Sequence, residues 1–357
     1  MMMFFAKGAT MLSPTRQLET MLHALTVALL LATIAGAQSL DWVQPSPPSS
    51  PSARCCMGIA FDAAAHSTVL FGGGNGTGVP SITYGDTWTW TAHRGWSELT
   101  PASSPSARQG PGMAYDGATG TVVLFGGVDT TGANLNDTWT WDGVTWTQQF
   151  PPVSPPGRQF DTQGMTYDAA TGTVLFFGGL LSNQDVLGDT WTWAGVAKTW
   201  TQQFPAASPS ARRTGVAYDA ANGTVVLFGG DIRNGDGGFG IYLGDTWTWN
   251  GVTWTQQFPA SAPAARGTSC IAYDTSLGRV VLFGGSSDYD SAQGRNDTWA
   301  WNGETWTEIF SAARPPARWV AAMDFDPLSK GLVLFSGEGN GDVFLDDTWI
   351  FVLAPSS

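Results

Sequence analysis

The stretch GDTWTWNGVTWTQQFP, residues 244–259, decides the fold of this chain. Its three tryptophans, Trp247, Trp249 and Trp254, lie on either side of an Asn250-Gly251 pair. Alternation of apolar and polar residues is typical of a β-strand, and a two-residue Asn-Gly turn is a strong signal for a hairpin. A cluster of tryptophans could also serve as a platform on which a sugar or a base stacks. The first question is therefore whether this stretch is scaffold or site.

The pattern of residues 244–259 recurs along the chain. The triplet Asp-Thr-Trp begins at six positions, Asp86, Asp137, Asp189, Asp245, Asp297 and Asp347. Before each triplet comes an apolar run that ends in Gly-Gly or Ser-Gly, and before that run an aromatic-Asp pair. An arginine precedes each pair, at Arg54, Arg108, Arg158, Arg212, Arg266 and Arg318. A period of about 50 residues is in the range of propeller and solenoid repeats.

Each repeat predicts four short strands. In the second repeat these are RQGPGMAYD, VVLFGG, DTWTW and TWTQQF, in that order. The second strand is apolar on both faces rather than alternating, so both faces of its sheet must be covered. Four-stranded sheets that stack radially around an axis meet this demand. We therefore predict an all-β fold, a six-bladed β-propeller of four-stranded antiparallel blades.

With these motifs the chain resembles the Kelch-repeat family, whose motif also occurs in the central domain of galactose oxidase. The resemblance rests on Gly-Gly pairs such as Gly229-Gly230, on the aromatic residue upstream of each pair, and on paired tryptophans such as Trp247 and Trp254. The resemblance covers roughly residues 38 to 353. Within the family, the chain is most similar in type to secreted Kelch-repeat proteins of bacteria. The resemblance implies the propeller fold and no particular activity.

The tryptophans also predict how the ring closes. Each of the first five repeats holds three of them, whereas the sixth has only Trp349 in these positions and lacks a fourth strand. Residues 40–54, LDWVQPSPPSSPSAR, match the fourth-strand segments of the other repeats, with Trp42 in the tryptophan position. We expect the N-terminal strand around Trp42 to complete the last blade. Trp319 is the one tryptophan that the repeat does not explain.

The N-terminal region differs from the repeats. Lys7 and Arg16 precede an apolar run that ends in Ala35-Gly36-Ala37, which fits a signal-peptidase site. We predict a signal peptide over residues 1–37, cleaved near Ala37, and a single propeller domain over residues 38–357. An uncleaved anchor is the alternative, although the run is shorter than the roughly 20 residues of a membrane span. The predicted location is secreted: extracellular, periplasmic or at the cell surface.

Composition and charge narrow the range of partners. The chain is 43% hydrophobic and 12% aromatic but only 13% charged, and its formal net charge is −13. Such a charge repels nucleic acids and anionic membrane surfaces. The predicted partner is therefore a carbohydrate or an extracellular protein, with no nucleic acid, no membrane span in the mature chain, and a monomer as the expected state.

Residues that recur in every repeat are predicted to serve the scaffold, because a ligand breaks the symmetry of a ring. The tryptophans of the third strands should fill the space between blades. The repeated aspartates and arginines should pair between strands, although a ring of six arginines could also hold an anion. Function is expected on the face of the longer, variable loops, which connect the second strand to the third and the fourth to the next blade.

The candidate ligand-binding residues are those on that face that do not repeat. Aromatic faces stack on the C–H faces of a sugar, and carboxylates accept hydrogen bonds from its hydroxyls. The predicted stacking groups are Trp319, Tyr242, Tyr289 and Phe239. The predicted polar groups are Asp231, Asp236, Asp288 and Asp290, with Arg213 at the same offset in its repeat as Trp319.

The sequence predicts no metal and no cofactor. The glycine-rich acidic loops lack the spacing and the final glutamate of a calcium loop. Copper-radical chemistry of the galactose oxidase kind is disfavoured, because it requires histidine ligands and the predicted mature chain has only His66 and His93.

The three cysteines show no disulfide framework. Cys55 and Cys56 are adjacent and interrupt the repeat next to Arg54. A disulfide between these neighbours is a candidate, whereas Cys270 lies in another repeat and is expected to be free and buried.

These observations favour a secreted binding module whose ligand, a carbohydrate in the first instance, lies on the long-loop face. Two alternatives stay open. One is a carbohydrate-active enzyme of the epimerase or lyase type that uses acidic residues at the channel mouth. The other is an adhesion or structural protein of the cell surface. Enzymatic activity is the less favoured interpretation.

Overall fold

The computed structural model describes residues 39–76, 82–182, 185–233, 239–287 and 293–353. Within these ranges the chain is all-β, and residues Leu40–Val352 form one compact unit. No helix in the described ranges has the length and hydropathy of a membrane span.

The described residues form six four-stranded antiparallel sheets, which we number as blades 1 to 6. Blade 1 consists of β2 (Gly58–Asp62), β3 (Ser67–Phe71), β4 (Thr87–Thr91) and β5 (Gly95–Leu99). Blade 2 consists of β7 (Gly112–Asp116), β8 (Thr121–Phe125), β10 (Thr138–Trp141) and β11 (Trp146–Gln149). Blade 3 consists of β12 (Met165–Asp168), β13 (Thr173–Leu180), β14 (Val186–Ala194) and β15 (Thr199–Gln203).

The remaining blades repeat this order. Blade 4 consists of β16 (Val216–Asp219), β17 (Thr224–Arg233), β18 (Phe239–Trp249) and β19 (Trp254–Gln257). Blade 5 consists of β20 (Cys270–Asp274), β21 (Arg279–Phe283), β22 (Thr298–Trp301) and β23 (Trp306–Ile309). Blade 6 consists of β25 (Ala322–Asp326), β26 (Gly331–Phe335), β29 (Thr348–Leu353) and β1 (Leu40–Val43). Short strands pair outside the blades: β6 (Arg108–Gln109) with β9 (Val128–Asp129), and β24 (Arg318–Trp319) with β27 (Glu338–Gly339) and β28 (Val343–Phe344).

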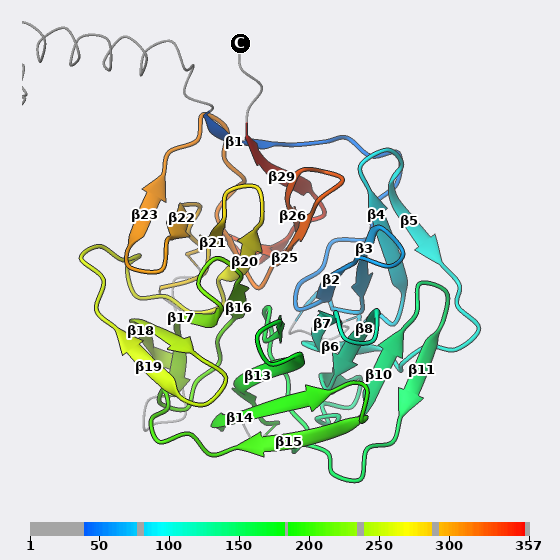
Figure 1. Ribbon diagram of the computed structural model, residues 1–357. Coiled ribbons are helices and arrows are strands. Elements are labelled where there is room, and N and C mark those ends of the chain that lie inside the picture. The colour runs from blue at the N-terminus through cyan, green and yellow to red at the C-terminus, as the bar shows by residue number, and fades with distance from the viewer. Residues whose placement is uncertain (1–38, 77–81, 183–184, 234–238, 288–292, 354–357) are drawn as a thin grey trace, which may run out of the picture. The chain divides into compact units, whose positions relative to one another are not determined.

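The blades stand side by side around a common centre, as Figure 1 shows. The first strand of each blade contacts the first strands of both neighbouring blades, and the contact between β2 and β25 completes the ring. Apolar clusters fill the space between adjacent blades. One of them joins Ala60, Val69 and Phe71 of blade 1 to Met113 and Leu124 of blade 2. The second strands are buried on both faces, as their unbroken apolar character predicts.

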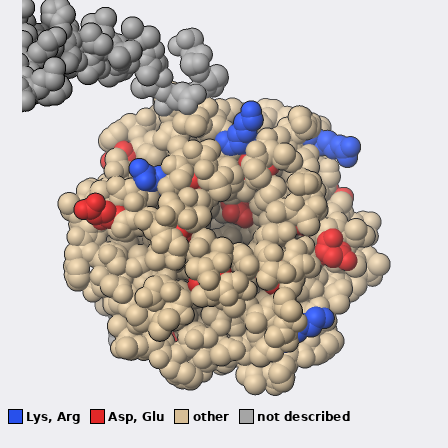
Figure 2. Space-filling model, in the orientation of Figure 1, with Lys and Arg blue, Asp and Glu red and all other residues tan. Residues whose placement is uncertain are grey.

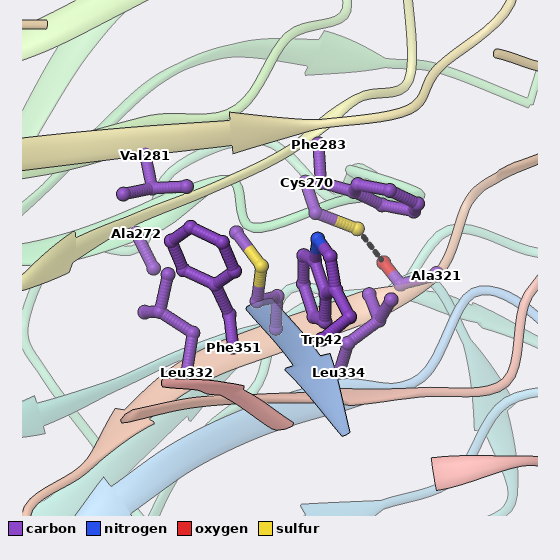
Figure 3. Close-up of a cluster of buried hydrophobic side chains, with 10 residues drawn as sticks. Trp42, Cys270, Ala272, Val281, Phe283, Ala321, Leu332, Leu334 and Phe351 are labelled. Atoms are coloured by element: carbon purple, nitrogen blue, oxygen red, sulfur yellow. Dashed lines mark hydrogen bonds between the residues drawn. The ribbon is translucent and has the colours of Figure 1, made fainter. Parts of the chain in front are cut away.

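Strand β1 closes the ring at its outer edge. It pairs with β29 and so supplies the fourth strand of blade 6. Figure 3 shows Trp42 among Phe351 and Leu334 of blade 6 and Phe283 of blade 5. The Trp42 indole Nε1–H donates a hydrogen bond of 3.0 Å to Thr298 Oγ1 of blade 5. The predicted closure around Trp42 is confirmed.

The stretch of residues 244–259 is scaffold. It forms the end of β18 and all of β19, with Trp249 directly opposite Trp254. Gly251 turns the hairpin with a φ of 91°, which glycine adopts without strain. Both tryptophans are only 1% exposed and lie in a cluster with blade 3 residues such as Phe177.

The fourth-strand tryptophans also bond the blades to one another. Each indole Nε1–H donates to the threonine of the Asp-Thr-Trp triplet in the preceding blade, at 2.9–3.1 Å. The pairs are Trp42–Thr298, Trp96–Thr348, Trp146–Thr87, Trp200–Thr138, Trp254–Thr190 and Trp306–Thr246. Packing and hydrogen bonding between neighbouring blades therefore explain why the fourth-strand tryptophan and the triplet threonine recur in every repeat.

The repeated arginines and aspartates form a buried ion pair within each blade. Arg266, fully buried, donates to both carboxylate oxygens of Asp297 and to the carbonyl oxygen of Gly284. The same carboxylate accepts a hydrogen bond from the indole of Trp299. Equivalent ion pairs occur in the other five blades. The predicted pairing is confirmed, and the alternative of an anion held by six arginines is wrong, because each guanidinium is engaged by its own aspartate.

Candidate functional site

Several predicted ligand residues lie outside the described part of the chain. These are Asp236, Asp288, Tyr289 and Asp290. Phe239 begins strand β18, but its side chain is not among those described. The structure therefore places only Trp319, Tyr242, Asp231 and Arg213 of the predicted set.

Trp319 lies in β24, where it is opposite Glu338 of β27. It is half-buried, and its side chain is close enough to Glu338 to influence the pKa of that carboxyl group. Burial and the charge of Asp342 raise the pKa of Glu338, and the Trp319 side chain partly opposes this. The one tryptophan outside the repeat thus has a polar partner beside it on the long-loop side of blade 6.

Arg213 and Asp231 are held together in an ion-pair cluster. The Arg213 guanidinium lies 3.1 Å from Asp231 Oδ2 and 2.5 Å from Asp161 Oδ2. Asp231 is fully buried, and its backbone pairs with Tyr242 in the neighbouring strand. Two carboxylates share one guanidinium, so their charge is only partly compensated, and the ion pairs join blades 3 and 4.

The cluster lies where the ring departs from its repeat. The segment between the repeated arginine and the aromatic-Asp pair is two residues longer in blade 3 and one residue shorter in blade 4 than in the other blades. Backbone hydrogen bonds link these segments from blade to blade, for example from Cys56 to Val320 and from Gly110 to Cys56. They continue into the altered segments, from Phe160 to Gly110 and from Val216 to Gln163. Asp161, in the longer segment, was not among the predicted residues; the unequal spacing is the signal that would have identified it.

A cavity of about 250 Å³ lies on the axis between the first strands of the blades. A ring of aromatic side chains lines it, and these are the aromatic residues that precede the inner-strand aspartates: Phe61, Tyr115, Tyr167, Tyr218, Tyr273 and Phe325. The lining also includes Thr275, from a turn between the first and second strands. The cavity is therefore near the short-turn face, opposite to the long loops on which the sequence analysis placed the ligand.

Asp324 is the acidic residue in the lining of this cavity. Its position is occupied by Ala60, Ala114, Thr166, Ala217 and Ala272 in the other blades. The Asp324 carboxylate accepts hydrogen bonds from the backbone N–H of Phe61, at 2.7 Å, and of Phe325, at 2.8 Å. Burial raises the pKa of Asp324 to about 6, although both of these hydrogen bonds act in the opposite direction.

Gln163 bounds the cavity from the long-loop side. Its side-chain Nε2 donates to the carbonyl oxygens of Ile59, at 3.2 Å, and Met113, at 3.4 Å. Since Gln163 belongs to blade 3 and Ile59 to blade 1, this side chain reaches past blade 2. It also belongs to the inserted segment of blade 3 that carries Asp161.

The tyrosines around the cavity are neutral hydrogen-bonding groups at neutral pH. Burial, followed by the charges of nearby aspartates, raises the pKa of Tyr115 and Tyr167 above the usual value of 10. Burial likewise raises the pKa of Tyr218 and Tyr273. The residues that line the cavity thus supply aromatic side chains, one carboxyl group and one amide.

Figure 2 shows a hollow at the centre of one face, with atoms of Asp or Glu residues visible inside it. Charged side chains are otherwise scattered over this face and form no continuous basic patch. In the described ranges no group of three or more His, Cys, Asp or Glu residues is placed to hold a metal ion.

The cysteines are free thiols. Cys270 is buried in the cluster that contains Trp42, as predicted, and its Sγ–H donates to the carbonyl oxygen of Ala321. The Sγ atoms of Cys55 and Cys56 lie 2.8 Å apart, so the disulfide between them stays a prediction.

The solved structure of YjhT superimposes on 85% of this chain and 95% of its own, with a TM-score of 0.62 and 13% sequence identity. The chain has a β-propeller fold. At this identity the similarity of the propeller to YjhT shows the fold alone. No family model matches the sequence.

A further relative by sequence is tRNA wybutosine-synthesizing protein 4 of Aspergillus fumigatus, which is 28% identical over 150 residues. The match covers 42% of this propeller chain and 14% of that protein, so the two share only a segment. The comparisons thus identify an architecture and leave the assignment of function to the chemistry of the cavity.

Proposed function

We propose that this β-propeller is a binding module that takes one small hydroxylated ligand, of the carbohydrate class, in its axial cavity. The observation that carries the proposal is Asp324, the carboxyl group that replaces alanine or threonine in a ring of otherwise equivalent positions. Thr166, at the equivalent position of blade 3, likewise accepts a backbone hydrogen bond from the next blade, so the feature that distinguishes Asp324 is its charge.

The composition of the cavity fits a sugar. The aromatic ring offers apolar surface for C–H groups, while Asp324 and Gln163 supply acceptors and donors for sugar hydroxyls. A volume of about 250 Å³ lies just below the roughly 300–1,000 Å³ of typical small-molecule pockets. This suits one sugar unit rather than an extended chain.

The long-loop face is the second candidate location for the same ligand. Trp319 beside Glu338 there offers one aromatic and one acidic group, the combination that the sequence analysis predicted. The secreted location and the signal peptide remain part of the proposal, because a glycan-binding protein meets its ligand outside the cell. Binding to an extracellular protein in an adhesive role is the outcome expected if no glycan binds.

The test is a glycan array followed by calorimetry with the best ligand. Wild-type protein should bind, and Asp324→Asn should weaken binding by about tenfold or more, because a hydrogen bond to a charged group contributes about 1.5–3 kcal/mol. The matched control is Asp346→Asn, which changes an exposed residue of the same blade. This variant should bind the ligand as tightly as wild type. If Trp319→Ala abolishes binding and Asp324→Asn does not, the ligand lies on the long-loop face. Absence of binding to any glycan would refute the carbohydrate assignment.

One observation favours an enzyme acting on the same ligand. A carboxyl group with a pKa of about 6 is suited to donate and accept protons near neutral pH. Incubation of wild-type protein with the bound sugar, followed by NMR spectroscopy, would detect epimerisation or elimination. Turnover that is lost in Asp324→Asn would support the enzyme, and binding without turnover would support the binding module.

A further inference from the structure

Cys55 and Cys56 form a thiol pair on the long-loop side of the axis, separate from the cavity of Asp324. The equivalent positions hold Gln109 and Gly110 in blade 2 and Trp319 and Val320 in blade 6. The pair therefore occurs only in blade 1 and is not required by the repeat.

The backbone turns the two thiols toward each other. Consecutive residues of an extended strand point to opposite sides. Cys56 departs from the extended conformation, with a φ of 59°, and the two Sγ atoms lie 2.8 Å apart. A disulfide bond is about 2.05 Å long, so bond formation requires the sulfur atoms to approach by less than about 1 Å.

Hydrogen bonds hold this arrangement from both sides. The Cys55 N–H donates to the carbonyl oxygen of Gly74, and the Gly74 N–H donates to the carbonyl oxygen of Cys55. The Cys56 N–H donates to Val320 O in blade 6, and Cys56 O accepts from Gly110 N in blade 2. The two thiols are thus positioned by blades 1, 2 and 6 together, which makes their proximity a property of the folded ring.

We propose that Cys55 and Cys56 are an oxidative modification site, at which a small disulfide oxidant converts the thiol pair into a disulfide between neighbouring residues. In the first step one cysteine thiolate attacks the oxidant disulfide and releases a monothiol, leaving a mixed disulfide. In the second step the other cysteine thiolate attacks the bonded cysteine sulfur and releases a second monothiol. Two electrons pass to the oxidant, and the two thiol protons end on the released monothiols.

The product is expected to be readily reduced. Neighbouring Cα atoms are about 3.8 Å apart, whereas disulfides usually join Cα atoms 4.4–6.8 Å apart. The shorter span strains the bond, and strained disulfides are the labile ones. The site is therefore reversible, in contrast to a structural disulfide.

The experiment uses reduced, folded wild-type protein, an excess of oxidised glutathione, and alkylation under denaturing conditions before intact-mass analysis. Wild-type protein should retain one alkylatable thiol of its three, that of Cys270, with no glutathione attached. Cys270→Ser should retain none, because Cys270 lies buried against Ala321 and takes no part. Monothiol treatment should restore the original thiol count.

Two results would overturn the proposal. One is wild-type protein that keeps all three thiols or carries a stable glutathione adduct. The other is equal formation of the internal disulfide in protein unfolded by urea, which would show that the folded ring does not position the thiols. Cys56→Ser is the matched variant, and it should yield a glutathione adduct instead of the internal disulfide.

Discussion

At the scale of single residues, Asp324 shows how one substitution in a repeat creates chemistry. Five blades have a small side chain at this position, and the sixth has a carboxyl group that neighbouring strands enclose. Its pKa of about 6 reflects burial against the axis, since its two backbone hydrogen bonds favour the charged form. The group is therefore half-protonated near pH 6, where ordinary aspartates are fully ionised.

This raised pKa predicts a pH dependence of stability. The folded protein holds the Asp324 proton more tightly than the unfolded chain, whose aspartate has the ordinary value of 3.8. The carboxyl group thus contributes stability that is fully present below about pH 4 and is lost as the pH rises through about 6. Asp324→Asn does not undergo this loss. The free energy of unfolding of the variant relative to wild type should therefore rise by about 2 kcal/mol from pH 4 to pH 7.

Urea denaturation at intervals between pH 4 and pH 7 measures this difference. The ion-paired aspartates, such as Asp297, respond in the opposite direction: burial raises their pKa, but the arginine bonds and charge outweigh it and lower the pKa. They are common to both proteins and cancel in the comparison. Parallel stability curves for wild type and Asp324→Asn would contradict the assigned environment of this carboxyl group.

At the scale of strands, the contact between blades depends on a tryptophan of one hairpin and a threonine of the preceding blade. In blade 4 the Trp254 indole donates to Thr190 Oγ1 at 2.9 Å, in a fully buried position. Trp249 lies directly opposite and is equally buried, but its indole N–H has no hydrogen-bond partner among the described residues. The two residues form a matched pair for a test.

A double-mutant cycle should separate the hydrogen bond from the packing. Thr190→Val should cost about 0.5–1.5 kcal/mol of unfolding free energy. It should couple to Trp254→Phe by about 0.5–1 kcal/mol and to Trp249→Phe by close to zero, because only Trp254 shares a bond with Thr190. Chemical denaturation of the six proteins in the two cycles, wild type included, measures both couplings. Equal coupling to the two tryptophans would mean that packing, and not the bond, joins the blades.

The strands were predictable from the sequence because their signals are local and repeated. Asn-Gly turns, apolar second strands and alternating tryptophans each specify a segment, and six copies leave little ambiguity. The cavity was not predicted, since the search was confined to the long loops and Asp324 lies within a strand. A comparison of the residue before each inner-strand aromatic, alanine in four blades, would have identified Asp324. The contact of Gln163 with blade 1 depends on the three-dimensional course of an inserted segment and has no local signal.

At the scale of the whole molecule, β1 joins the two ends of the ring. Its Trp42 is 1% exposed, packs against blades 5 and 6, and donates a hydrogen bond to Thr298. Every other blade is a continuous segment of chain, so blade 6 is the one whose assembly requires residues from both ends of the described unit.

Loss of the Trp42 side chain should therefore open the ring. Trp42→Ala is expected to lower the free energy of unfolding by about 3–5 kcal/mol, as for other large buried aromatic residues. Val43→Ala changes an exposed residue of the same strand and should have little effect. Thermal unfolding gives the stabilities, and limited proteolysis should show faster cleavage of residues 40–50 in Trp42→Ala alone. Equal stabilities would exclude a closing role for β1.

The closure by β1 has a consequence for how the protein folds. Strand β1 precedes all other described strands in the chain, yet its partner β29 follows all of them. During synthesis the remaining blades can form one after another from local contacts, while β1 waits without a partner until the last strand is complete. Contacts between such distant segments form slowly. Until they form, the unpaired edges of β1 and β29 can pair with strands of other molecules. The first of the described strands to be made is the last to be placed, so the rate of its docking sets how long the unfinished ring is exposed to proteolysis and aggregation.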